Sequence, residues 1–84
     1  MFTAEQIDNQ TRHIESPDAQ VEAMKAIFLE QDDSSRFPIN GRFNATERAF
    51  ANIEALEEAN GPLYGLEFSL SVEREISEIV NAEL

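Results

Sequence analysis

The sequence predicts an all-α fold, a small bundle of three to four helices, and three observations support this prediction. Apolar residues recur at helical spacing, as in Val21, Met24 and Phe28. Helix-capping signals precede such segments, and proline or glycine separates them. The chain has 84 residues, 42% of them hydrophobic, which suffices for one thin core but not for two. We therefore expect a single helical domain over residues 1–84. Its predicted helices are residues 4–15, 17–31, 45–59 and 70–83.

The first two helices are predicted from their capping residues. Thr3 and Gln6 have the spacing of a capping box, in which each side chain bonds the backbone N–H of the other residue. Ser16 can cap the second helix, and Pro17 suits its first position because the N–H that proline lacks would be unsatisfied there. Pro17 also ends the first helix.

Residues 32–44 are predicted to form an irregular loop between the second and third helices. Within it, Asn40-Gly41 is a strong signal for a tight turn, so a minor β-hairpin is an open alternative at this point. The flanking segments are short and include Pro38, which disfavours strand pairing.

The third helix has clear ends, whereas the start of the fourth is ambiguous. Asn44 can cap the third helix, and Gly61, followed by proline, should end it. Residues 63–72 could be strand, loop or helix, because four apolar residues alternate there before a helical pattern begins. The alternating residues are Leu66, Phe68, Leu70 and Val72. We expect an extended connector that leads into the fourth helix near residue 70.

The charge is strongly acidic and unevenly distributed. Seventeen acidic and six basic residues give a net charge of −11, which argues against direct DNA or RNA binding because that requires a basic face. Residues 49–84 hold eight acidic residues and one basic residue, whereas residues 37–48 hold one acidic and two basic residues. A solubilising surface is the simplest interpretation. The functional interpretation is a surface for a basic partner, formed by Glu54, Glu57, Glu58, Glu73, Glu75 and Glu78.

The locally basic segment suggests an alternative function, the binding or sequestering of a nucleotide. Arginine can hold phosphate, phenylalanine can stack on a base, and asparagine can read the edge of the base. The candidate residues are Arg36, Phe37, Asn40, Arg42 and Phe43. The structural interpretation is that the two phenylalanine rings plug the open end of the bundle while the arginines pair with nearby acidic residues.

The residue inventory gives little material for catalysis or metal binding. There is no cysteine and one histidine, so disulfides, thiolate metal sites and cysteine catalysis are excluded. Two Glu-x-x-Glu pairs, Glu54 with Glu57 and Glu75 with Glu78, could share a magnesium ion, but this spacing arises readily in any glutamate-rich helix. We therefore expect no enzyme, no metal and no cofactor. With no signal peptide and no apolar run that could span a bilayer, the expected location is the cytoplasm, away from the membrane.

In size, lack of cysteine and acidity, the chain resembles the small inhibitors that phages and other mobile elements direct against host nucleic-acid enzymes. This resemblance implies an anti-defence inhibitor that mimics nucleic acid, and it assigns no role to any residue. The leading hypothesis is thus an acidic interaction module that occupies a basic, nucleic-acid-binding surface of a partner. A further alternative is a structural, homo-oligomeric helical protein. A homodimer is suggested by an apolar cluster of Leu63, Tyr64, Leu66 and Phe68.

Overall fold

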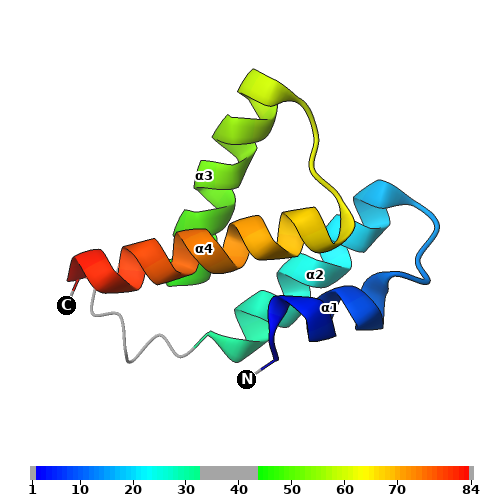
Figure 1. The fold of residues 1–84 in the computed structure, drawn as a ribbon, viewed down its shortest axis with the longest axis horizontal. Coiled ribbons are helices and arrows are strands. Elements are labelled where there is room, and N and C mark those ends of the chain that lie inside the picture. Colours follow the sequence, from blue (N-terminus) through cyan, green and yellow to red (C-terminus); the bar gives the residue numbers. More distant parts are fainter. Residues whose placement is uncertain (1, 33–43, 84) are drawn as a thin grey trace.

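The computed structural model describes residues 2–32 and 44–83, which form four α-helices (Figure 1). The helices are α1 (Ala4–Thr11), α2 (Pro17–Gln31), α3 (Ala45–Asn60) and α4 (Gly65–Glu83). The prediction of a small all-α bundle is confirmed. No strand occurs within the described ranges, and the alternative hairpin at Asn40-Gly41 lies outside them.

The predicted capping residues begin three of the helices. The Thr3 hydroxyl accepts the Gln6 N–H at 3.2 Å, and the Gln6 side-chain oxygen accepts the Thr3 N–H at 2.8 Å, so the capping box is confirmed. Ser16 caps α2 through its hydroxyl. The Asn44 side-chain oxygen accepts the Glu47 N–H at 2.8 Å at the start of α3. Local sequence therefore sets where these helices start.

The first helix ends earlier than predicted, at Thr11 rather than at residue 15. The Thr11 carbonyl accepts the Ile14 N–H at 3.0 Å and the Gln20 side-chain amide at 3.3 Å. A tight turn and a side chain from α2 thus replace the helical hydrogen bonds. The chain needs these residues to reverse direction before Pro17 so that α2 can pack against the other helices.

The fourth helix begins at Gly65 rather than near residue 70. The expected extended connector up to residue 70 is therefore wrong for residues 65–69, which are helical. Phe68 and Val72 are 1% and 0% exposed, whereas Leu66 and Leu70 are 36% and 45% exposed. Each pair is four residues apart, so the apparent alternation is two helical stripes, one buried and one exposed. Gly65 has a φ of +57°, which a glycine adopts without strain where the chain turns into the helix.

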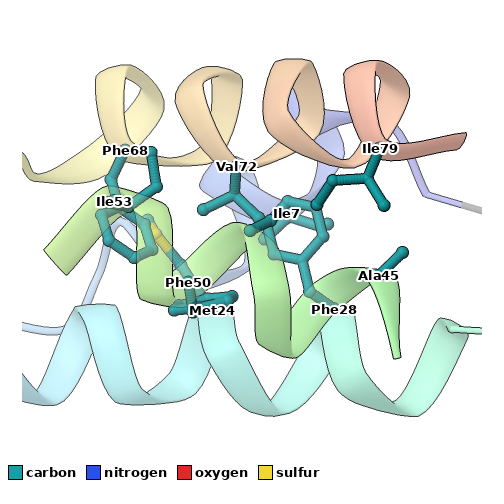
Figure 2. Close-up of a cluster of buried hydrophobic side chains, with 10 residues drawn as sticks. Ile7, Met24, Phe28, Ala45, Phe50, Ile53, Phe68, Val72 and Ile79 are labelled. Atoms are coloured by element: carbon teal, nitrogen blue, oxygen red, sulfur yellow. The ribbon is translucent and has the colours of Figure 1, made fainter. Parts of the chain in front are cut away.

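The core lies between α2 and α4 and receives side chains from all four helices (Figure 2). Its aromatic rings form a row: the centroids of Phe28 and Phe50 are 6.4 Å apart, and those of Phe50 and Phe68 are 5.3 Å apart. Phe50 is therefore the central ring, held by α2 on one side and α4 on the other. The largest aliphatic members of the cluster are Ile7, Met24, Ile53, Val72 and Ile79.

Polar contacts hold the helices in register around this core. The Asp32 carboxylate accepts the Thr46 N–H at 3.0 Å, which ties the end of α2 to the start of α3. The Ser69 hydroxyl is buried and donates to the Met24 sulfur at 3.3 Å, between α4 and α2. The Asp32 carboxylate, which bonds the Thr46 N–H, also faces the positive end of the α3 dipole, an arrangement that stabilises α3.

Candidate partner-binding surface

The C-terminal end of α3, residues 54–60, projects from the rest of the molecule (Figure 1). Its side chains are exposed, apart from a half-buried Glu57, and even Leu56 is 44% exposed. The Asn52 amide donates to the Glu75 carboxylate at 2.9 Å, near the point where α3 crosses α4. Beyond that crossing, α3 receives little support from the other helices. We call residues 54–60 the projecting end.

The acidic residues of the projecting end are unfavourable for the helix itself. Glu54 lies three positions before Glu57 and four before Glu58, and like charges at these spacings each cost about 0.2–0.5 kcal/mol. The last turn of α3 has no basic residue, although the negative end of a helix dipole favours cations. Helix stability therefore does not explain these three glutamates.

Glu57 also has a structural role. Its carboxylate accepts the Leu63 N–H at 2.9 Å and so anchors the connection between α3 and α4, residues 61–64. Gly61, at the start of this connection, has a φ of +98°, which side-chain-bearing residues rarely adopt. The connection is therefore anchored at Leu63, and Gly61 permits the turn with which it begins.

The glutamates of α4 are placed differently from those of α3. The Glu73 carboxylate accepts the Ala4 N–H at 3.2 Å, where it faces the positive end of the α1 dipole. Glu75 is bonded to Asn52, and Glu78 is exposed. The structure thus brings Glu54, Glu57 and Glu58 together on the projecting end. It does not bring the α4 glutamates into one surface with them, because Glu73 lies against α1 and Glu75 is bonded at the crossing.

Two hollows beside the projecting end add acidic residues that the sequence did not point to. A hollow of about 340 Å³ is lined by Glu54, Glu57, Glu58 and Pro62. A second hollow, of about 250 Å³, shares Glu57 and Pro62 with the first and is also lined by Asp18, Val21, Glu22 and Tyr64. We call Asp18, Glu22, Glu54, Glu57 and Glu58 the acidic surface. Its two α2 members are four positions apart, the only sequence signal that could have identified them.

A larger hollow, of about 400 Å³, shares Glu54 with the first. It is lined by Lys25, Glu47, Arg48, Phe50, Ala51, Asn52 and Glu54. These include two cations, a ring and an amide, but Phe50 is only 5% exposed and the centroid of its ring already lies 5.6 Å from the Lys25 ammonium. The Asn52 amide donates to Glu75. Ring and amide are therefore both engaged within the protein and do not favour a nucleotide there.

The remaining expectations concern sites of other kinds. The candidate nucleotide-binding residues Arg36, Phe37, Asn40, Arg42 and Phe43 lie outside the described residues. Within residues 2–32 and 44–83, no three acidic, histidine or cysteine side chains are grouped closely enough to hold a metal ion. No helix in the same ranges combines the length and hydropathy needed to cross a bilayer. Phe68, one of the four apolar residues behind the expected homodimer, is buried in the core.

A reversal of charge at Glu58, in the projecting end, should stabilise the protein. Glu58→Lys is expected to raise the melting temperature by a few degrees, because a cation at the C-terminal end gains about 0.3–1 kcal/mol and pairs with Glu54 four positions earlier. Glu67→Lys is the matched control, since Glu67 is exposed in the first turn of α4 and has no charged residue three or four positions away. Thermal unfolding at low salt should show a rise for the first variant and a fall for the second. An equal rise of the melting temperature in both variants would mean that the gain comes from the lower net charge and not from the helix end.

The acidic surface gathers five carboxylates from α2 and α3 around the exposed Pro62. Such a surface can bind a cationic group through charge-assisted hydrogen bonds, and it attracts basic molecules over a distance set by the salt concentration. Comparison with models of protein families, with curated proteins and with solved structures finds no match to this chain.

Proposed function

We propose that this protein is a small acidic interaction module that occupies a basic, nucleic-acid-binding surface of a partner protein and so inhibits it. In this proposal, the carboxylates of the acidic surface take the places of nucleic-acid phosphates. The observation that carries it is the projecting end of α3, where Glu54 and Glu58 are exposed at a cost to their own helix, with the half-buried Glu57 between them. Residues that weaken a fold without serving its core are characteristic of functional sites.

The positions of the glutamates support a contact made by Glu54 and Glu58. Glu54 and Glu58 are exposed and extend from the body of the molecule, so a partner can approach them without rearranging the core. The carboxylates of Glu73 and Glu75 accept hydrogen bonds from other helices of the protein. We therefore assign both residues to the fold rather than to the contact. Glu78 is left as an exposed carboxylate on a separate helix.

A capture experiment tests the proposal. The immobilised protein is incubated with a cell extract at about 0.05 M and about 0.5 M salt, because the range of electrostatic attraction shrinks several-fold between these concentrations. The retained proteins are identified, and duplex DNA or RNA is then added as a competitor. We expect a nucleic-acid-handling protein to be retained at low salt, lost at high salt and displaced by the competing nucleic acid.

The control bait is the variant Glu54→Lys, Glu57→Gln, Glu58→Lys, in which glutamine preserves an acceptor for the Leu63 N–H. It should retain none of the same protein. Retention by this variant, or a retained protein that nucleic acid does not displace, would contradict the proposed function.

A further inference from the structure

We infer that the hollow between the start of α2 and the connection at residues 61–64 receives an arginine side chain of the basic partner. This inference rests on the proposed function and names the centre of its contact. The hollow has a volume of about 250 Å³, and its described lining contains three carboxylates and no basic residue. The lining residues are Asp18, Val21, Glu22, Glu57, Pro62 and Tyr64.

The lining of the hollow combines apolar and aromatic side chains with carboxylates. Tyr64, the only tyrosine of the chain, is 40% exposed, whereas Phe28, Phe50 and Phe68 form a buried row. Val21 and Pro62 provide apolar contacts beside it. The connection that carries Pro62 and Tyr64 is held in place by the hydrogen bond from the Leu63 N–H to Glu57, so the hollow is already formed in the free protein.

The three carboxylates of the lining differ in what the fold requires of them. Asp18 lies in the first turn of α2, where a negative charge stabilises the helix dipole. Glu57 anchors the connection through Leu63. Glu22 is exposed and lies away from either helix end, so neither requirement applies to it. Glu22 is therefore the carboxylate that can be changed with least effect on the fold.

Arginine fits this combination better than lysine does. Its planar guanidinium can bond a carboxylate with two parallel hydrogen bonds and can stack on an aromatic ring. Its methylene stem can cover apolar groups such as Val21 and Pro62. A lysine ammonium would satisfy the charge but would gain much less from the face of Tyr64. Arginine is also, with lysine, one of the two residues that protein surfaces use to bind nucleic-acid phosphate, which agrees with the proposed partner.

Tyr64 provides a direct measurement of this contact. The chain has one tyrosine and no tryptophan, so its intrinsic fluorescence reports Tyr64 alone. Hexa-arginine and hexa-lysine peptides carry the same charge and have no aromatic residue. In titrations at low salt, we expect hexa-arginine to change the Tyr64 emission saturably and to bind at least threefold more tightly than hexa-lysine. Calorimetry of the Tyr64→Leu variant should show hexa-arginine binding reduced to the level of hexa-lysine.

The variants separate the hollow from the wider acidic surface. Glu22→Gln should weaken hexa-arginine binding several-fold, whereas Glu78→Gln, which removes one exposed carboxylate on α4, should leave it nearly unchanged. Equal binding of the two peptides with no change at Tyr64 would overturn the arginine site while leaving the acidic surface as the contact. Binding of neither peptide would overturn both the arginine site and the proposed function.

Discussion

Phe68→Ala is expected to lower the free energy of unfolding by about 3–5 kcal/mol, the usual cost of deleting a buried aromatic ring. Phe68 is 1% exposed and contacts Phe50, the central ring of the core. A domain of 84 residues is stable by roughly 4–13 kcal/mol, so this loss could exceed the whole stability. Chemical denaturation followed by circular dichroism should therefore show unfolding at a much lower denaturant concentration than for the unsubstituted protein, with loss of the folded state at the low end of this range.

Leu70→Ala is the matched control, since Leu70 lies two residues away on α4 and is 45% exposed. Its effect should stay within about 0.5 kcal/mol, as for surface substitutions in general. The sequence is compatible with a strand over these residues, whereas the helix predicts this contrast between two neighbouring apolar positions. Similar losses in both variants would contradict the assignment of Leu70 to an exposed stripe.

The second large effect concerns association with the basic partner. The variant Glu54→Lys, Glu57→Gln, Glu58→Lys is expected to slow association with a captured, DNA-displaceable partner at least tenfold at low salt. Electrostatic steering between oppositely charged surfaces raises association rates by about 10–1,000-fold, and this variant changes the charge of the projecting end by five units. The difference should shrink near 0.5 M salt, where charges interact only over a few ångströms. Stopped-flow or surface-based kinetics would measure both rates.

A control with the same total change of charge distinguishes a local surface from net charge. Glu15→Lys, Glu30→Lys and Glu78→Gln replace three exposed glutamates that lie outside the acidic surface. If the acidic surface is the contact, this control should slow association far less than the variant of the projecting end. Equal slowing would mean that only the total charge of −11 matters.

The sequence by itself determined the fold class and most helix ends. Thr3, Ser16 and Asn44 were identified as caps because capping is a contact between residues two or three positions apart, and the structure places each of them at a helix start. Gly61 ends α3 for an equally local reason, its positive φ. The excess of acidic residues in the second half of the chain is likewise a property of the sequence. Three of these acidic residues lie on the projecting end.

The tertiary structure decided the features that depend on contacts between distant residues. The segment from Leu66 to Val72 has a period that fits a strand locally, and packing of Phe68 against Phe50 selects the helix. Periodicity placed all six glutamates on helices, but only the crossing of α3 over α4 separates Glu73 and Glu75 from the projecting end. Asp18 and Glu22 are more than 30 positions before Glu57 in the chain. The packing of the helices brings the start of α2 to the end of α3, so that all three residues line the same hollow. Local chemistry thus sets the starts of α1, α2 and α3, whereas packing selects the helix at the start of α4 and determines which charges share a surface.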